Sequence, residues 1–221
     1  MKHLILTRHN YNEDYPHLEE RKKLIEKYTK KSLENQTSKN FIWCIVTKHP
    51  VYSDIIDIIN FKNKKELEGF MNTFDDVLLT SRVDNDDILS PEYVESVQEK
   101  ASELINKGKE EALIDSTGYR WDKRVDSFYK DFLYESNSNS PFLSVLSRDK
   151  TCWHDKHGHM SKHFENNYFI SKSLWIQIIH QTNKLMNRVN PLGISNQGTE
   201  CEEPEFFKEY KGDIDLNKSK K

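Results

Sequence analysis

The chain has 221 residues and a formal net charge of −3, so its length suits one domain and its charge favours neither nucleic acid nor an anionic membrane as a partner. Charged residues make up 31% of the sequence, while eleven Phe, ten Tyr and four Trp supply the apolar surface of a globular core. This composition excludes a largely disordered chain.

The cysteines and the apolar segments bear on the compartment. Cys44, Cys152 and Cys201 are far apart and no Cys-x-x-Cys pair occurs, which favours a reducing environment over a disulfide framework. The apolar stretch at the N-terminus is too short for a signal peptide, and no window reaches the length that spans a bilayer. We therefore expect a cytoplasmic protein without a transmembrane segment.

Apolar strands and amphipathic helices alternate through the first part of the chain. The predicted strands are residues 3–7, 41–47 and 76–84, and the predicted helices are residues 15–35 and 64–74. Residues 53–61 fit either a helix or a strand. This order predicts an α/β fold in which helices flank a mostly parallel central sheet.

The second part of the chain is less regular. Ser90 as N-cap and Pro91 in the first turn predict a helix over residues 90–108. The further predictions are a strand over 111–122 with a turn at Gly118, a strand over 141–148, and a helix over 172–186 with Leu174, Ile178 and Leu185 facing inward. No internal repeat or domain boundary is visible, so residues 1–221 are predicted to form a single domain.

Three polar clusters directly follow apolar strands, at residues 7–10, 47–49 and 84–87. In a parallel sheet, ligands bind beyond the carboxyl ends of the strands, so these clusters are expected to line one crevice. The third cluster, called the acidic turn below, places Asp84, Asp86 and Asp87 within four residues. An ordinary turn or helix cap is one interpretation. A divalent cation site is the other, because carboxylates bind Mg²⁺ or Mn²⁺ and leave positions open for diphosphate oxygens.

The sequence around the acidic turn, "LLTSRVDNDDILSPEYVE", resembles the Asp-x-Asp segment of nucleotide-sugar glycosyltransferases with the GT-A fold. "LTRHN" at the first strand end and "SLENQTSKNFIWCIVT" are similar to further segments of those enzymes. "SLWIQIIHQTNKLMNR", "GYRWD" and "SPFLSVLSR" resemble the rhamnosyltransferase-like branch. The resemblance implies a GT-A domain with a nucleotide-binding half (1–95), an acceptor-side half (96–200) and a polar tail (205–221).

The resemblance also implies roles for individual residues. Asp86 would bind Mn²⁺ or Mg²⁺, Asp84 would contact the metal or the ribose, and His180 would complete the metal shell. Asp87 would act at the catalytic centre by holding the loop or the donor sugar. The other implied contacts are Thr7, Arg8, Asn10 and Thr47 at the nucleotide, Arg82 at the diphosphate, and Asn183 beside His180 or the acceptor. For His180, a purely structural histidine is the alternative.

The segment "CWHDKHGHMSKH" contains four histidines, yet no paired cysteine spacing supports a closed zinc site. His157 and His159 are candidates for the acceptor side or for a third metal ligand, and an ordinary loop is the alternative. Asp155 is the predicted general base, with Glu200, Glu202 and Glu203 as other candidates.

The predicted function is a metal-dependent transfer of a sugar from a UDP, GDP or dTDP donor to a hydroxyl of a glycan or other acceptor. Inversion at the anomeric carbon is expected by analogy with the family. A non-catalytic nucleotide- or carbohydrate-binding module is one alternative. A magnesium-dependent phosphodiesterase or nuclease is another, although the sequence has no basic stripe for a nucleic-acid backbone.

Overall fold

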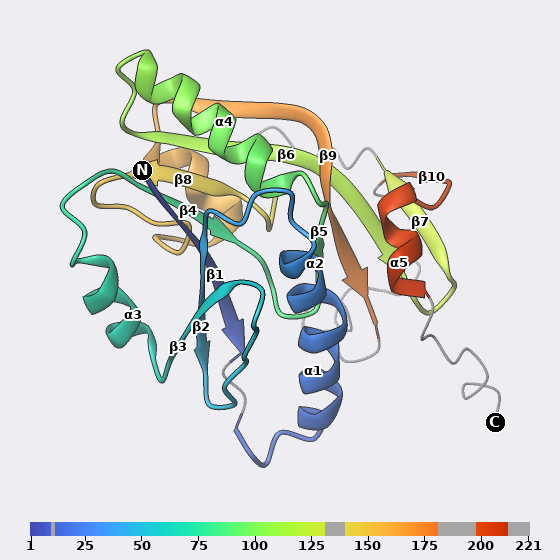
Figure 1. The fold of residues 1–221 in the computed structure, drawn as a ribbon. Coiled ribbons are helices and arrows are strands. Elements are labelled where there is room, and N and C mark those ends of the chain that lie inside the picture. The colour runs from blue at the N-terminus through green and yellow to red at the C-terminus, as the bar shows by residue number, and fades with distance from the viewer. Residues whose placement is uncertain (10–11, 131–139, 181–197, 212–221) are drawn as a thin grey trace.

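The computed structural model describes residues 1–9, 12–130, 140–180 and 198–211. Within them, ten strands form one sheet (Figure 1). The strands are β1 (Lys2–His9), β2 (Ile42–Thr47), β3 (Asp57–Phe61), β4 (Leu78–Arg82), β5 (Ile88–Leu89), β6 (Ala112–Asp122), β7 (Ser127–Lys130), β8 (Ser144–Ser147), β9 (Asn167–Ile179) and β10 (Thr199–Cys201). The helices are α1 (Leu18–Leu24), the π-helix η1 (Ile25–Lys30), α2 (Lys31–Glu34), α3 (Lys64–Met71), α4 (Tyr93–Asn106), the 3₁₀ helices η2 (His157–His163) and η3 (Glu205–Phe207), and α5 (Lys208–Lys211).

The sheet has a parallel core and an antiparallel extension. Strands β3, β2, β1 and β4 lie side by side and are parallel. Strand β8 then joins β4 in the antiparallel direction and is followed by β6, β7 and β10. Strand β9 runs parallel to β6 and also pairs with the short β5. The sheet therefore continues through both halves of the chain, and the predicted α/β fold with a parallel core is confirmed.

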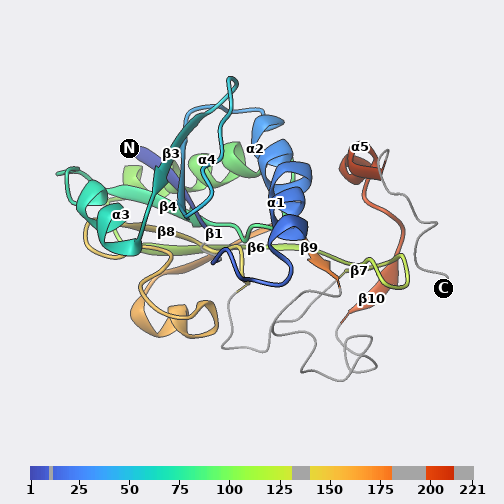
Figure 2. The ribbon, with the colours of Figure 1, turned by 90° about the horizontal axis from the view of Figure 1, so that it is seen from below.

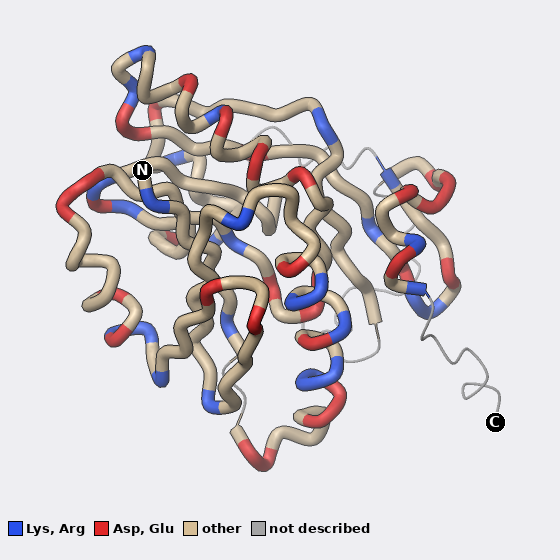
Figure 3. Tube along the Cα trace, viewed as in Figure 1, with Lys and Arg blue, Asp and Glu red and all other residues tan. Residues whose placement is uncertain are grey.

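Alternate residues of the strands face two apolar layers. In β1, Ile5 packs in the cluster that contains Trp43 and the inner residues of α4, whereas Leu4 and Leu6 pack with Leu67 of α3 and Met160 of η2. Helices α1, α2 and α4 accordingly cover one face of the sheet, and the gold coil of η2 lies on the other (Figure 2). A third cluster joins α1 and η1 to β9 and α5. Basic and acidic residues are interspersed along the trace (Figure 3).

One predicted helix is wrong. Residues 172–186 were expected to be helical, but residues up to Ile179 belong to strand β9, and residues 181–197 lie outside the described part. Leu174 and Ile178 fit a helical spacing, yet Trp175, Ile176 and Ile179 are apolar as well. This run, which only Gln177 interrupts, contains three β-branched isoleucines and is typical of a strand that is covered on both faces.

The predicted turn at Gly118 is also wrong, because β6 continues through this residue. The pairing of β6 with β9 shifts its register on both sides of Thr117, so the irregularity is a bulge and not a turn. The ring of Trp175 lies over Gly118, and a Cβ atom at that position would come within 2.1 Å of it. The glycine is therefore required by a close approach between two strands.

The start of α4 differs from the prediction in its cap. Ser90 was expected to be the N-cap, but α4 begins at Tyr93 and Gln36 supplies the cap from outside the helix. The Gln36 Oε1 accepts a hydrogen bond from the Val94 amide at 3.0 Å, and its Nε2 donates to the Ser90 carbonyl at 2.8 Å. Gln36, just after α2, thus holds the start of α4 in place.

Candidate active site

The acidic turn lies just beyond the carboxyl end of β4, between β4 and β5. The amide of Val83 donates to the Leu6 carbonyl of β1, so the turn starts beside the end of β1. Asp86 and Asp87 are buried, whereas the Asp84 side chain is 42% exposed. A ligand can therefore meet the turn most directly from the side of Asp84.

Asp86 joins three distant parts of the chain. Its Oδ2 accepts a hydrogen bond from Arg21 of α1 at 2.5 Å and one from Nε2 of His180, just after β9, at 2.9 Å. The side chains of Arg21 and His180 are each 4% exposed and that of Asp86 is 7% exposed. The structure therefore brings together Asp86 and His180, called the buried pair below, and adds a cation that the sequence interpretation had not included.

The backbone of the acidic turn is held from two directions. The Thr29 hydroxyl of η1 lies 3.1 Å from the Asp84 carbonyl and 3.0 Å from the Asp87 carbonyl. On the other side, Asp87 Oδ1 accepts a hydrogen bond from the Ile178 amide of β9 at 2.8 Å. The carboxylate of Asp87 is thus used to tie the turn to β9, which agrees with a loop-holding role.

Burial and charge act differently on the two buried carboxyl groups. Burial alone would raise the pKa of Asp86, but the hydrogen bond from His180 and the charge of Arg21 outweigh it, so the pKa is lowered. Burial raises the pKa of Asp87 well above its ordinary value, and the neighbouring charges of Asp86 and Asp84 raise it further. Of these two buried carboxyl groups, Asp86 is therefore the one whose ionised form is favoured.

On the α1 side of the sheet, the predicted nucleotide residues make contacts within the protein. Thr7 is fully buried, and its hydroxyl donates to the Val83 carbonyl and accepts from the indole of Trp43. The Thr47 hydroxyl caps the following turn through the amide and carbonyl of His49. Both hydroxyls stabilise the strand ends, and neither side chain is on an open surface.

Asn85 connects the acidic turn to the end of β1. Its Nδ2 donates to Nδ1 of His9 at 2.7 Å, and the His9 ring lies edge-on to His49 with a centroid separation of 6.3 Å. Burial lowers the pKa of His9 to about 4, so its imidazole is neutral near pH 7. The three strand ends predicted to converge are therefore in contact.

Two arginines lie on the opposite face of the sheet, and one of them contacts the acidic turn. The Arg8 side chain is exposed and lies over the ring of Trp153, 5.2 Å from its centroid. Arg82 NH2 lies 3.3 Å from Asp84 Oδ1, and its Nε is buried without a hydrogen-bond partner among the described residues. The Arg82 side chain is 22% exposed, so its guanidinium, and not the buried Nε, is the part that an anion could reach.

The donor atoms of the buried pair suit a divalent cation in part. His180 Nε2 and Asp86 Oδ2 are 2.9 Å apart, and adjacent ligands of an octahedral ion with bonds of about 2.1 Å are separated by about 3 Å. A nitrogen ligand favours Mn²⁺ over Mg²⁺, which prefers oxygen. No group of three or more His, Cys, Asp or Glu side chains converges in the described part of the chain. Asp84, or the diphosphate, would have to complete the shell.

The histidine-rich segment forms its own polar cluster, next to Trp153. His163 Nε2 donates to Asp155 Oδ2 at 2.9 Å, and His159 Nδ1 lies 4.0 Å from Asp155 Oδ1. The Asp155 side chain is 35% exposed, and the hydrogen bond from His163 lowers its pKa. Asp155 and His163 are called the exposed pair below. His157 is half-buried in η2.

Two of the predicted site residues lie outside the described part of the chain, and two residues that contact the acidic turn were not predicted. Asn10 and Asn183 lie outside the described residues. Arg21 and Thr29 were not predicted to act at the site, although Arg21 lies three residues after Leu18 and four before Ile25 on the apolar stripe of α1. An arginine on the buried face of a helix needs a buried partner. The position of Arg21 on the apolar stripe was therefore the sequence signal that could have identified it.

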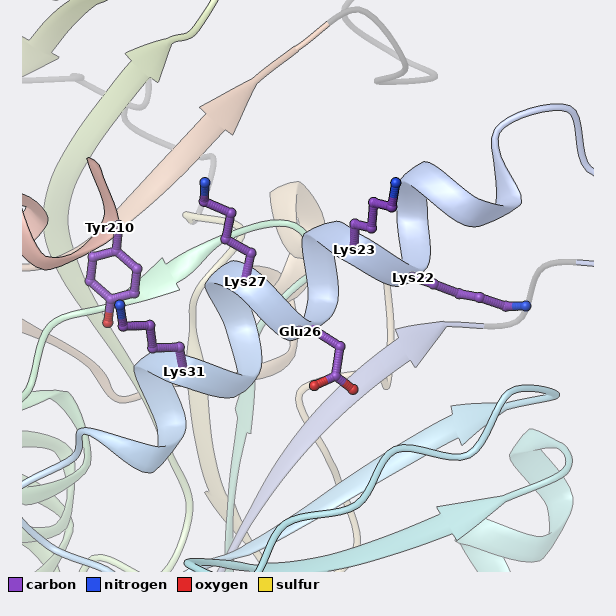
Figure 4. A pocket seen from close by; sticks show the side chains of 6 residues that line it. All are labelled: Lys22, Lys23, Glu26, Lys27, Lys31 and Tyr210. Atoms are coloured by element: carbon purple, nitrogen blue, oxygen red, sulfur yellow. The ribbon is translucent and has the colours of Figure 1, made fainter. Parts of the chain in front are cut away.

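A basic groove of about 660 Å³ lies elsewhere, along α1, η1 and α2. It is lined by Lys22, Lys23, Glu26, Lys27, Lys31 and Tyr210 (Figure 4). The side chains of Lys23, Lys27 and Lys31 extend from one side of the helix (Figure 4), and Lys31 already donates to the Glu209 carbonyl at 2.7 Å. The groove contains no strand end and one carboxylate, so it is not the donor site inferred above.

The fold is that of GT-A glycosyltransferases. The structure is similar to that of Staphylococcus aureus TarS 1–349 in complex with UDP-GlcNAc, with a TM-score of 0.50 and 11% identity over 83% of this chain and 60% of that one. Longer S. aureus TarS gives a TM-score of 0.45 with 12% identity over 81% of this chain and 37% of that one. A nucleotide-diphospho-sugar transferase structure from Desulfovibrio desulfuricans gives 0.39 with 10% identity over 82% and 84%. The chain thus spans less than two thirds of the length of the TarS structures.

The sequence profile of the family described as "Putative rhamnosyl transferase" matches residues 62–189, which include the acidic turn and His180. The match covers more than half of the chain, and the chain belongs to this family. The comparison with curated protein sequences found no match. Among the described residues, none of the helices has the length and apolarity needed to cross a membrane.

Proposed function

We propose that this protein is a metal-dependent glycosyltransferase that moves a sugar from a nucleoside diphosphate to a hydroxyl acceptor. The observation that carries the proposal is the buried pair, which stands at the carboxyl ends of the parallel strands in a chain of the rhamnosyl transferase family. Ligands of open α/β sheets bind at this edge. UDP is the first donor nucleotide to test, because the TarS structure with the same fold contains UDP-GlcNAc.

In this proposal, Asp86 and His180 would hold Mn²⁺, Asp84 would contact the ion or the ribose, and the Arg82 guanidinium would bind the diphosphate. The cation, when bound, would offset the negative charge that the diphosphate gains as it leaves. Arg8 and Trp153 would border the same ligand from the η2 face of the sheet. Asp87, Thr29 and Asn85 keep the turn in place.

The transfer itself needs a base on the acceptor side. Asp155 would take the proton of the acceptor hydroxyl. As it does so, the hydroxyl oxygen would bond to the anomeric carbon, and the bond between that carbon and the diphosphate would break. The lowered pKa of Asp155 keeps the carboxylate ionised near pH 7, and its exposure leaves it open to an acceptor. Inversion follows from a single displacement of this kind.

The experiment is donor turnover with UDP-, GDP- and dTDP-sugars, each with Mn²⁺ and with EDTA, followed by chromatography of the released nucleotide. The expected result is release of one nucleoside diphosphate that depends on Mn²⁺. Tight nucleotide binding without turnover would favour a binding module. Cleavage of a phosphodiester substrate with no release from any sugar donor would favour the phosphodiesterase alternative.

A further inference from the structure

Arg21 occupies the same carboxylate oxygen that the proposed metal site needs. Its NH1 lies 2.5 Å from Asp86 Oδ2, the atom that also accepts the hydrogen bond from His180. The Arg21 side chain comes from α1, 65 residues before its partner, and is almost fully buried. The permanent positive charge of Arg21 therefore lies at hydrogen-bond distance from the carboxylate that is proposed to bind the metal ion.

The burial of this ion pair gives the charge of Arg21 a large effect. Water screens charges poorly in such a place, so a divalent ion that approaches Asp86 is strongly repelled by the guanidinium. A diphosphate that arrives with the ion brings negative charge, which the same guanidinium attracts. Arg21 consequently opposes the bare ion and favours the complex of ion and nucleotide.

We propose that Arg21 is a built-in counter-ion of Asp86, which competes with the divalent cation and makes its binding depend on the nucleoside diphosphate. This inference rests on the proposed function. It describes Arg21 as a positioning residue, since it acts through Asp86. Without metal, the ion pair keeps a buried carboxylate compensated, and an uncompensated buried charge would be strongly destabilising.

Orientation of Asp86 does not depend on Arg21 alone. His180 holds the same carboxylate, Thr29 holds the backbone on one side, and Asp87 ties the turn to β9 on the other. When Arg21 is replaced by a neutral residue, the turn keeps these restraints and loses the positive charge. The loss of repulsion is therefore expected to exceed the loss of orientation.

The test is the affinity for Mn²⁺ alone, measured by the decrease of its free electron paramagnetic resonance signal in the native protein and in Arg21→Gln. The variant is expected to bind Mn²⁺ about tenfold or more tightly than the native protein. Its thermal unfolding temperature should be lower without metal and should rise more than that of the native protein when Mn²⁺ is added. Lys30→Gln is the matched control, because it removes an equal charge from the same helix at a surface pair with Glu26. It should leave the affinity unchanged.

The outcomes separate this inference from the proposed function. Equal or weaker Mn²⁺ binding by Arg21→Gln, with the native protein binding Mn²⁺ and UDP, would overturn the competition and leave the metal site intact. No Mn²⁺ binding by either protein, even with UDP, would overturn both. Should Arg21→Gln not fold, Arg21→Met, which keeps the apolar stem, and the native protein carry the test. Native affinity for Mn²⁺ that is no weaker without UDP than with it would overturn the inference.

Discussion

An aspartate and a histidine meet at two places in this molecule with the same separation and opposite surroundings. In the buried pair, His180 Nε2 and Asp86 Oδ2 are 2.9 Å apart, and the two side chains are 4% and 7% exposed. In the exposed pair, His163 Nε2 and Asp155 Oδ2 are also 2.9 Å apart, and the side chains are 34% and 35% exposed. The geometry of the contact alone does not distinguish them.

The surroundings of the two pairs suit them to different tasks. The buried pair is assembled from the turn after β4 and the end of β9, with Arg21 of α1 in contact, so its atoms are fixed by the fold. Breaking such a buried pair costs about 3–5 kcal/mol, whereas an exposed pair is worth about 0–1 kcal/mol. Fixed donor atoms suit the binding of an ion, and an accessible carboxylate suits proton transfer.

The largest effect is expected from Asp86→Asn, which removes the charge of the buried pair and keeps its shape. Turnover of the sugar donor should fall about a thousand-fold, because the site loses a ligand of the cation that would stabilise the charge of the leaving group. Steady-state kinetics on protein shown to be folded by circular dichroism would measure this. Asp149→Asn, an exposed carboxylate hydrogen-bonded to Ser147, is the control and should retain full activity. Native activity in Asp86→Asn would contradict the metal assignment.

The exposed pair should give the next largest effect. Asp155→Asn is expected to lower kcat by about 10²–10⁴-fold, since the general base is lost, while the affinity for UDP and Mn²⁺ stays the same. The free energy of unfolding should change little, because the pair is exposed to water. Pre-steady-state kinetics and urea unfolding measure the two quantities. If kcat changes less than about threefold, another residue is the base, and the exposed pair has no role in proton transfer.

A substitution in β6, outside both pairs, is expected to disturb the buried pair through β9. In Gly118→Ala the new Cβ would lie 2.1 Å from Cδ2 of Trp175, so β9 must shift, and His180 follows this strand directly. A loss of stability of about 1–3 kcal/mol is expected, together with weaker Mn²⁺ binding. Gly69→Ala in α3 is the control, since nothing lies within 4 Å, and it should be neutral or stabilising. Calorimetric unfolding of both variants decides the point, and equal stability would show that the bulge tolerates a side chain.

The smallest effect concerns a third histidine, which is buried without a carboxylate. His3 Nε2 lies 2.8 Å from the Ser81 hydroxyl, and its Nδ1 accepts from Gln98 at 3.2 Å. Burial lowers the pKa of His3 to about 3, below the unfolded value of 6.5, so protons favour the unfolded state. This contribution to stability is complete above pH 6.5 and is lost at about 1.4 kcal/mol per pH unit as the pH falls toward 3.

Denaturant unfolding of the native protein and of His3→Gln at pH 7 and pH 5 would measure this effect. The native protein should lose more stability between the two values than the variant does. An equal loss in both proteins would mean that His3 takes up a proton in the folded state. In that event burial alone would not explain the pKa of a buried histidine in this protein.

The local pattern of the sequence predicts the parallel core and the acidic turn. Residues 41–47 form a continuous apolar run, as a doubly covered strand requires, and the polar clusters follow the strand ends. Residues 172–186 are predicted to be a helix because Leu174, Ile178 and Leu185 fit a helical spacing, whereas pairing with β6 and the close approach of Trp175 to Gly118 decide for a strand up to Ile179. This error placed His180 on a helix, whereas it extends from the end of β9.

Long-range partners are what the sequence could not supply. Arg21 and Asp86 are separated by 65 residues, and no local pattern connects them. The same holds for Thr29, which reaches two carbonyls of the acidic turn, and for Gln36, which caps α4. The residue types and strand ends predict where a ligand would bind, and the helix that holds those residues in place becomes visible only in three dimensions.

The most direct test of the central claim is isothermal titration of UDP into the native protein with Mn²⁺, repeated with EDTA. If the buried pair holds a cation that the diphosphate shares, UDP binds with Mn²⁺ and the heat of binding disappears with EDTA. Equal binding of UDP in both conditions would contradict a metal site at Asp86 and His180. If UDP, GDP and dTDP all gave no heat in either condition, the acidic turn would have no role in donor binding.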